Sequence, residues 1–435
     1  MIGNFMRKRK MVFLLFAGLF WHCQPPVVVQ QEPIQTQESE VVADTVEQFI
    51  TELKIESPKL GIENFYENFA EKWQDKTIGL VTNQTGILPD GRTNIEYLAE
   101  KIEIQKIFSP EHGFLGIELA GNGDENHAFI QSLYRKSPEK IAKEFANLDL
   151  VLFDIQDVGV RPYTFLTTMV KAMKASEIAD VPFFILDRPN PIGEVISGAV
   201  LDSMFLSDIG AWPVTYCHGR TLGELAKFAQ NLGIGATTEI IPMQNWSSAD
   251  GFSAFGIHWI PSSPHIPKLE TISPFATFGA IGELGVISEG VGWTLPFEVL
   301  GAPWVSADFP LADSLNSLNL SGISFRKISF KPFYGRFKNK TCHGVQLIIA
   351  ESGISDPFWS GIAILEKLIC LFPEIEFFAD KTGVRMFDLA CGTDKIRIGL
   401  QNGKLLDEII MEQKPKFEQF SEFREQFLIY KSKAQ

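Results

Sequence analysis

The sequence predicts an α/β protein with a Rossmann-like parallel-sheet N-terminal domain and a smaller mixed α/β C-terminal domain. Three features of the N-terminal part indicate this class. Short, continuous apolar segments recur along it, stretches that can form helices separate them, and a group of polar residues follows each apolar segment. Buried parallel strands are continuous apolar runs, and their alternation with helices gives a sheet that is covered on both faces.

The expected strands and helices alternate from residue 78 onward. The apolar segments predict strands at 78–82, 104–108, 148–155 and 181–186. The segments between them predict helices at 93–101, 138–145 and 165–179. Beyond about residue 300, the sequence predicts strands at 323–329 and 344–350 and a helix at 359–372. We therefore expect a Rossmann-like catalytic domain over 58–300 and a C-terminal α/β domain over 301–435 that closes a cleft.

Polar side chains gather at the carboxyl ends of the expected strands. They are Asn83 after the first strand, Glu111 and His112 after the second, Asp154, Asp157, Arg161 and Tyr163 around the end of the third, and Arg188 and Asn190 after the fourth. Ligands of open α/β sheets bind in the crevice beyond these strand ends. We therefore expect these side chains to converge on one site.

The first 23 residues have the pattern of an export signal. Four basic residues at 7–10 precede the apolar run 11–21, which is too short to span a membrane. Cys23 follows this run and indicates a lipoprotein acylated on that residue, although His22 stands where a small residue is usual. Residues 24–57 are rich in Gln, Glu, Thr, Val and Pro and predict a flexible tether. We expect an exported protein, periplasmic or at the cell surface, that a lipid on Cys23 holds to the membrane.

Composition and the absence of several motifs exclude other classes. The net charge of −14 argues against nucleic-acid binding, which depends on clustered Lys and Arg. The sequence contains no GxGxxG after the first expected strand and no GxxxxGK[ST], GxSxG or HExxH. None of the five cysteines forms a CxxC pair. The sequence leaves open whether the cysteines form one or two disulfides or are free thiols. We expect neither a cofactor nor a metal.

Glu111 is the carboxyl group best placed for acid–base chemistry. Glycoside hydrolysis generally needs one carboxylic acid that protonates the leaving oxygen and a second group that acts as base or nucleophile. Glu111 lies between Pro110 and His112-Gly113, in an expected turn that would limit its contact with solvent. A glutamate that caps a helix or pairs with an arginine is an equally good interpretation of the residue alone.

Seven ordered motifs carry a resemblance that covers the chain from about residue 60 to its end. They are LVTNQTG at 80–86, SPEHG at 109–113, DIQDVG at 154–159 with Arg161 and YT at 163–164, LDRPNP at 186–191, HG at 218–219 with GELA at 223–226, PFE at 296–298 with GAPW at 301–304, and FD at 387–388 with GTD at 392–394. Together they resemble the exo-β-N-acetylmuramidase family, glycoside hydrolase family 171.

The resemblance implies both an activity and a set of site residues. It implies release of N-acetylmuramic acid from the non-reducing ends of peptidoglycan fragments, in a cleft between the two domains. It also implies that Glu111 is the catalytic general acid/base. The second catalytic group stays open among Asp154, Asp157, Glu224, Glu289 and the acetamido group of the substrate. Residues expected to bind the substrate are Asn83, His112, Arg161, Tyr163, Arg188, Asn190, His218, Glu224 and Glu289.

One segment departs from the family pattern. Where the family is expected to have SEGRGTTRPFE, residues 288–298 are SEGVGWTLPFE, so that Val291 and Leu295 replace two arginines. Arginine is a natural partner for a carboxylate, and muramic acid carries a lactyl carboxylate that glucosamine lacks. Arg161 and Arg188 then remain as candidates to bind it, unless they pair with Asp157 or Asp187. We expect at least one of Asp154 and Asp157 to pair with Arg161.

Two other functions remain open beside the glycosidase. His112, His218, Asp154 and Asp157 have the ligand types of a metal-dependent amidase or deacetylase. The two missing arginines favour a catalytically impaired, cell-wall sugar-binding lipoprotein instead. An exo-acting glycosidase on cell-wall amino sugars is the leading interpretation.

Overall fold

The computed structural model describes residues 57–119, 121–123, 128–351 and 353–430. The expected signal, Cys23 and residues 24–56 of the expected tether lie outside these residues. Within the described ranges, no helix combines the length and apolar character needed to cross a membrane.

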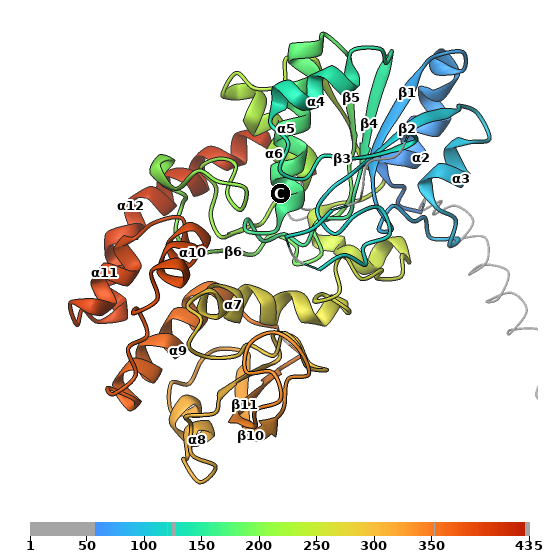
Figure 1. Ribbon diagram of the computed structural model, residues 1–435. Coiled ribbons are helices and arrows are strands. Elements are labelled where there is room, and N and C mark those ends of the chain that lie inside the picture. Colours follow the sequence, from blue (N-terminus) through green and yellow to red (C-terminus); the bar gives the residue numbers. More distant parts are fainter. Residues whose placement is uncertain (1–56, 120, 124–127, 352, 431–435) are drawn as a thin grey trace, which may run out of the picture. The chain divides into compact units, whose positions relative to one another are not determined.

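A six-stranded parallel sheet forms the centre of the N-terminal part (Figure 1), in the order β3-β2-β1-β4-β5-β8. Its strands are β1 (Ile78–Thr82), β2 (Ile104–Ser109), β3 (Ile130–Ser132), β4 (Leu150–Asp154), β5 (Phe183–Leu186) and β8 (Thr238–Ile241). β1 pairs with β2 on one side and with β4 on the other. The strand order therefore reverses at β1 and β4, as in Rossmann folds, and a ligand crevice is expected there. The predicted fold class is confirmed.

Helices cover both faces of this sheet because its strands alternate their apolar side chains. Val81 and Phe153 belong to the cluster that includes α4 (Pro138–Phe145) and α5 (Thr164–Ala179). Their neighbours Leu80 and Leu152 belong to a second cluster with α2 (Gly61–Asn68) and α3 (Asn94–Leu98). Successive residues of a strand point to opposite faces, so these continuous apolar runs bury both faces of the sheet.

The C-terminal part contains a small antiparallel sheet in the order β10-β11-β9. Its strands are β9 (Val299–Ala302), β10 (Ile323–Phe330) and β11 (Cys342–Ile349). The boundary expected at residue 300 falls inside β9, which pairs with β11 from Val299 onward. The predicted strands at 323–329 and 344–350 correspond to β10 and β11.

The remaining elements connect and cover these sheets. The further α-helices are α6 (Leu222–Asn231), α7 (Ile272–Glu283), α8 (Leu311–Asn316), α9 (Pro357–Leu371), α10 (Lys381–Cys391), α11 (Lys395–Gln401) and α12 (Leu406–Arg424). Short 3-10 helices are η1 (Ala70–Trp73), η2 (Ser203–Phe205), η3 (Ser248–Asp250), η4 (Phe252–Phe255), η5 (Leu269–Thr271) and η6 (Glu425–Phe427). β6 (Ile196–Ser197) and β7 (Cys217–His218) form a two-stranded ribbon.

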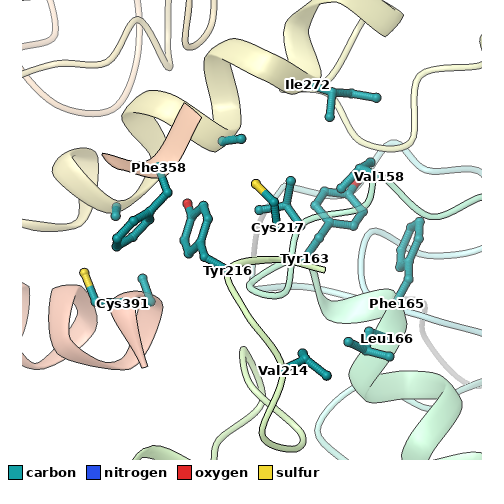
Figure 2. Packing of buried hydrophobic residues seen from close by; sticks show 14 of the residues in the cluster. Val158, Tyr163, Phe165, Leu166, Val214, Tyr216, Cys217, Ile272, Phe358 and Cys391 are labelled. Atoms are coloured by element: carbon teal, nitrogen blue, oxygen red, sulfur yellow. The ribbon is translucent and has the colours of Figure 1, made fainter. Parts of the chain in front are cut away.

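The N- and C-terminal parts share one hydrophobic core. Figure 2 shows Tyr216, which precedes β7, directed toward Phe358 of α9, with Cys391 of α10 nearby. The Tyr216 and Phe358 ring centroids are 4.6 Å apart. Both residues are fully buried in the cluster that also contains the α4 and α5 side chains. Cys217, Cys342, Cys370 and Cys391 are free thiols.

Candidate active site

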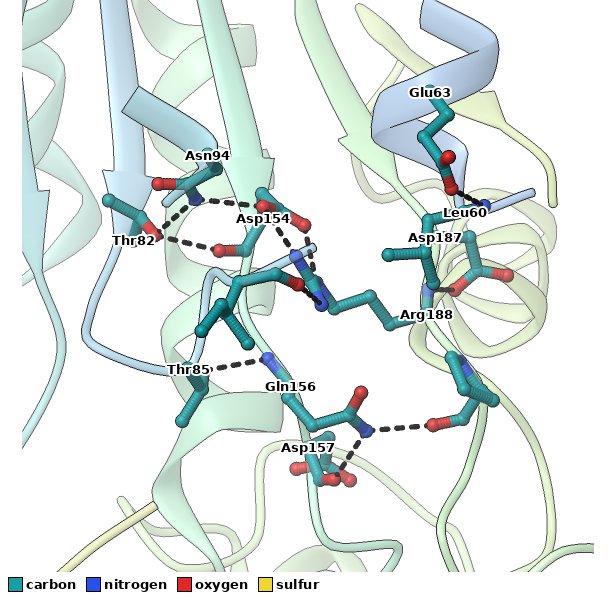
Figure 3. Close-up of polar contacts among 12 residues, drawn as sticks. Leu60, Glu63, Thr82, Thr85, Asn94, Asp154, Gln156, Asp157, Asp187 and Arg188 are labelled. Atoms are coloured by element: carbon teal, nitrogen blue, oxygen red, sulfur yellow. Dashed lines mark hydrogen bonds and ion pairs between the residues drawn. The ribbon is translucent and has the colours of Figure 1, made fainter. Parts of the chain in front are cut away.

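Asp154 and Arg188 form a buried ion pair where β1, β4 and β5 end (Figure 3). The Arg188 Nε and Nη2 atoms lie 2.6 and 2.9 Å from the two carboxylate oxygens of Asp154. Asn94 Nδ2 also donates to Asp154 Oδ2, at 2.7 Å, and Arg188 Nη1 donates to the carbonyl of Ile87. The two charges are therefore compensated inside the protein, and the predicted use of Arg188 to bind a substrate carboxylate is wrong.

The structure also contradicts the role expected for Arg161. Its side chain is completely buried, and it forms no ion pair with Asp154 or Asp157. Its Nη1 donates to the carbonyls of Ala199 and Val214, and its Nη2 donates to the carbonyl of Ala390. Burial lowers the pKa of Arg161 to about 10. Arg161 thus joins the loop after β4 to α10 and does not face a substrate.

Asp187, at the end of β5, is a buried acceptor that sequence reasoning did not select. Its carboxylate accepts hydrogen bonds from Thr221 Oγ1 at 2.6 Å, Gly223 N at 2.8 Å and Tyr430 Oη at 2.8 Å. Tyr430 Oη accepts a further bond from Met243 N. Burial raises the pKa of Asp187 to about 6 despite these donors. The end of the chain is thereby fixed to the carboxyl edge of the sheet.

Glu111 follows β2 and lies at the start of α5. Its carboxylate is largely buried and accepts two short hydrogen bonds, from Gly121 N at 2.6 Å and from Thr164 Oγ1 at 2.7 Å. Thr164 is the first residue of α5. The start of α5 therefore supplies one of these two donors. The hydroxyl of Tyr134 also interacts with Glu111, and the carboxylate keeps a further lone pair that can bind a hydroxyl or a glycosidic oxygen.

Aromatic and imidazole groups surround the segment that carries Glu111. His112 has the left-handed backbone angle φ of 71°, and its Nδ1 lies 2.8 Å from the carbonyl oxygen of Glu118. Its ring centroid is 6.3 Å from that of Tyr163. The Tyr163 hydroxyl donates to Ser262 Oγ at 2.8 Å, and burial raises its pKa strongly. His112 and Tyr163 therefore lie together, as the sequence predicted.

His265 and Tyr134 also lie beside this segment, although sequence reasoning missed them. His265 Nε2 is 2.6 Å from the hydroxyl of Tyr334, which comes from the C-terminal part. Burial, and then the neighbouring His112, lower the pKa of His265. Burial, and then the charge of Glu111, raise the pKa of Tyr134. No local motif marks these residues, because only the folded chain brings them to Glu111.

A second polar group lies beyond the end of β4. Asp157 Oδ2 accepts from Gly159 N at 2.7 Å and lies 3.2 Å from His218 Nε2. Asn83 Oδ1 accepts from both the backbone and the hydroxyl of Thr85. Within the described residues, three buried atoms here have no hydrogen-bond partner: Asp157 Oδ1, Asn83 Nδ2 and Gln156 Oε1. Since buried polar groups are nearly always paired, these atoms are candidates for contact with a bound ligand.

Two other expected substrate-binding residues, Glu224 and Asn190, have structural contacts. Glu224 Oε2 accepts from Thr221 N at the start of α6, and its Oε1 accepts from Ile429 N at 3.0 Å. These contacts fix the Glu224 carboxylate between the start of α6 and the end of the chain, and its predicted contact with the substrate stays a prediction. Asn190 stabilises its own loop, because its Nδ2 donates to the Arg220 carbonyl and its Oδ1 accepts from Ile192 N.

Glu289 lies against α7. A Cβ placed on Gly282 would be 2.8 Å from the Glu289 carboxyl carbon, so the Glu289 side chain lies directly against this glycine of α7. Its Oε2 is buried without a hydrogen-bond partner in the described part of the chain, and burial raises its pKa. The contacts of Glu289 place it against α7, whereas those of Asp154, Asp157 and Arg188 lie at the carboxyl edge of the sheet.

The possible metal ligands are already engaged in separate contacts. Asp154 pairs with Arg188, His218 contacts Asp157, and His112 contacts a backbone carbonyl. Among the residues that the structure describes, no three His, Cys, Asp or Glu side chains are grouped as a metal site would require.

Comparisons with known proteins assign the family. Residues 78–270 match the N-terminal domain of the exo-β-N-acetylmuramidase NamZ family, and residues 275–430 match its C-terminal domain. The chain belongs to this family. The resemblance carried by the seven sequence motifs is thereby confirmed.

Relatives of known sequence or structure support the NamZ assignment. The chain is 35% identical over 383 residues to the peptidoglycan β-N-acetylmuramidase NamZ of Bacillus subtilis strain 168, which covers 85% of this chain and 91% of the relative. A crystal structure of a DUF1343 family protein from Bacteroides fragilis NCTC 9343 has a TM-score of 0.79 and 32% identity, covering 86% and 99% of the two chains. A second DUF1343 structure from this organism has a TM-score of 0.64 and 28% identity, covering 87% and 100%.

The two positions that depart from the expected NamZ pattern are part of the packing. Val291 packs against the main hydrophobic cluster, and Leu295 packs in a small cluster with Val299, Phe330 and Cys342. Neither side chain can replace the positive charge of an arginine.

Proposed function

We propose that this chain is an exo-acting glycosidase that releases N-acetylmuramic acid from the non-reducing ends of peptidoglycan fragments, with Glu111 as general acid/base. Membership of the NamZ family and the identity with the Bacillus subtilis relative support a muramidase. The observation that carries the assignment to Glu111 is its position: a buried carboxyl at the carboxyl edge of the sheet, held by two short hydrogen bonds.

The contacts of Glu111 fit both halves of an acid–base cycle. In the first half, Glu111 gives its proton to the glycosidic oxygen as the bond to the sugar breaks, and the acetamido oxygen of the sugar or Asp157 Oδ1 forms a bond to the anomeric carbon that the water displaces later. Gly121 N–H, Thr164 Oγ1 and the start of α5 then stabilise the carboxylate that remains. In the second half, this carboxylate accepts a proton from the attacking water, which restores the acid.

Asp157 is the better supported of the two aspartates for a direct part in the reaction. Arg188 and Asn94 occupy the carboxylate oxygens of Asp154. We therefore propose that Asp154 holds the ends of β1 and β4 in position. Asp157 keeps one buried oxygen without a partner in the described residues, and His218 holds the other. This oxygen can orient the acetamido group of the sugar or form a bond to the anomeric carbon.

We propose in addition that the mature chain is exported and attached to a membrane by acylation of Cys23. The basic and apolar segments at 7–21 support export, and the position of Cys23 directly after them supports the attachment. A lipoprotein would act on peptidoglycan outside the cytoplasm.

The activity is tested with defined peptidoglycan disaccharides. We expect the purified protein to release free N-acetylmuramic acid from a disaccharide with this sugar at the non-reducing end, and to leave the reverse disaccharide intact, as measured by mass spectrometry of the products. A chelator should not change the rate. Loss of activity with chelator would favour the metal-dependent alternative, and binding without turnover would favour an impaired sugar-binding protein, which the loss of charge at Val291 and Leu295 suggests.

A further inference from the structure

The proposed substrate needs a positive charge that Arg161, Arg188 and Arg220 do not supply. N-Acetylmuramic acid differs from N-acetylglucosamine by a lactyl ether that ends in a carboxylate. Arg161 donates to three backbone carbonyls, and Arg188 forms a buried ion pair with Asp154 and donates to the Ile87 carbonyl. Arg220 is buried, and its guanidinium contacts Gly219 and Glu425. The carboxylate must therefore be bound elsewhere.

Arg135 is a guanidinium at the same edge of the sheet that has no such internal partner. β3 ends at Ser132, and the turn that follows carries Tyr134 and Arg135. The side chain of Arg135 is exposed. Its contacts within the described part of the chain are with Tyr134, and no carboxylate there forms an ion pair with it.

Two contacts place Arg135 next to the catalytic carboxyl. A Cβ placed on Gly121 would lie 3.8 Å from Arg135 Nη2, so the guanidinium borders the residue whose N–H donates to Glu111. Tyr134 forms the second connection, because its hydroxyl interacts with both Glu111 and Arg135. The Arg135 guanidinium carbon also lies 5.1 Å from the centroid of the Tyr134 ring, which holds it by a cation–π contact.

Arg135 has a strained backbone conformation, although the turn itself does not require an arginine at this position. Its φ is 56°, in the left-handed region that disfavours side chains other than glycine, asparagine and aspartate. Strained residues of this kind cluster at ligand sites. The turn in this conformation places the long cationic side chain of Arg135 beside Glu111.

We propose that Arg135, held by Tyr134, binds the lactyl carboxylate of the substrate and makes the site selective for muramic acid. This inference rests on the proposed function and names the group that gives it specificity. The planar guanidinium can donate two parallel hydrogen bonds to a carboxylate, which an ammonium group cannot do in the same geometry. Arg135 thus supplies the cation that Val291 and Leu295 do not.

The experiment compares three glycosides that differ at one group. They are a chromogenic β-N-acetylmuramide, its lactyl methyl ester and the matching β-N-acetylglucosaminide. Arg135→Gly removes the cation and relieves the strain in the backbone, Arg135→Lys keeps the charge without the fork, and Lys140→Ala removes an exposed charge from nearby α4 as a control. The measured quantity is kcat/KM for each combination of protein and glycoside.

We expect Arg135→Gly to lower kcat/KM for the muramide about 10- to 100-fold, the loss typical of a hydrogen-bonded charged partner. The methyl ester and the glucosaminide should change by less than about 2-fold, and Arg135→Lys should lie between the wild type and Arg135→Gly. Lys140→Ala should match the wild type. Equal loss on the muramide and its ester, or no loss on either, would overturn the assignment to Arg135.

Failure of the proposed function would be recognised separately. If the wild-type protein hydrolyses none of the three glycosides, the glycosidase proposal is wrong, whatever the variants do. Calorimetric binding of free N-acetylmuramic acid and of its methyl ester then decides the role of Arg135. Tighter binding of the acid that Arg135→Gly abolishes would support the subsite, and equal binding of both compounds by the wild type would overturn it.

Discussion

Glu111→Gln is the change that tests the proposed chemistry most directly. Glutamine has nearly the shape of glutamate but has no proton to give to a leaving oxygen. Its amide oxygen can still accept one of the two hydrogen bonds that Gly121 N and Thr164 Oγ1 donate to Glu111. The amide nitrogen can then donate to Thr164 Oγ1, because a hydroxyl also accepts, so the variant replaces two charge-assisted hydrogen bonds by two neutral ones.

The structure separates the expected loss of activity from the expected loss of stability. General acid catalysis contributes about 10²–10⁴-fold, which corresponds to roughly 3–5 kcal/mol in the activation free energy. The change from charge-assisted to neutral hydrogen bonds should cost about 1–3 kcal/mol in the free energy of unfolding. A protein with a typical stability of about 5–15 kcal/mol stays folded after that loss.

The assay uses two substrates and a control from the same loop. With a disaccharide, whose sugar leaving group needs protonation, kcat should fall by about 10²–10⁴-fold, and with a nitrophenyl glycoside it should fall much less. Glu118→Gln changes a partly exposed glutamate of the same loop and should leave both rates unchanged. A folded Glu111→Gln protein that cleaves the disaccharide at more than about one tenth of the wild-type rate would refute the assignment of Glu111.

Three further predictions concern the surroundings of the site. The pKa of Asp187 rises from 3.8 to about 6 on folding, so the stability that it contributes is fully present below pH 3.8 and is lost as the pH rises through 6. This contribution amounts to about 3 kcal/mol in the free energy of unfolding. In denaturant unfolding, the free energy of unfolding of Asp187→Asn should therefore decline less between pH 4.5 and 7.5 than that of the wild type. Arg161→Met should lower the midpoint of denaturant unfolding and leave the muramide-to-glucosaminide ratio of kcat/KM unchanged, whereas a changed ratio would restore Arg161 as a substrate-binding residue. Cys23→Ala should move the mature protein from the membrane fraction to the soluble fraction, and a wild-type mature protein that is soluble would contradict acylation.

The sheet and its carboxyl edge could be predicted because they depend on local patterns. The expected strand 78–82 has the observed bounds of β1, and the expected helix 138–145 has those of α4. Continuous apolar runs identify parallel strands, and the polar residues that follow them must then meet at one edge. The sequence therefore located Glu111, Asp157 and Asn83 correctly at strand ends.

The partners of the charged residues could not be predicted, because they come from distant parts of the chain. Arg161 looked like a ligand for a carboxylate, yet its acceptors include Ala390, which is 229 positions away. Arg188 was a candidate to bind the lactyl carboxylate, with an ion pair to Asp157 or Asp187 as the alternative, and its partner in the structure is Asp154. A strand-end motif fixes where a residue lies, whereas its neighbours across the fold decide whether the side chain faces a ligand or the core.

The C-terminal part contributes contacts that hold the carboxyl edge of the sheet in place. Tyr430 donates to Asp187, and Arg424 donates to the carbonyl of His218, whose ring contacts Asp157. Removing these residues would take one donor from Asp187, which keeps Thr221 and Gly223, and would take the Arg424 donor from the His218 carbonyl, at a cost of about 0.5–1.5 kcal/mol for each hydrogen bond. Tyr216 would also lose its contact with Phe358. The two domains that the family distinguishes therefore stabilise one site together, and neither half contains all the contacts that the site needs.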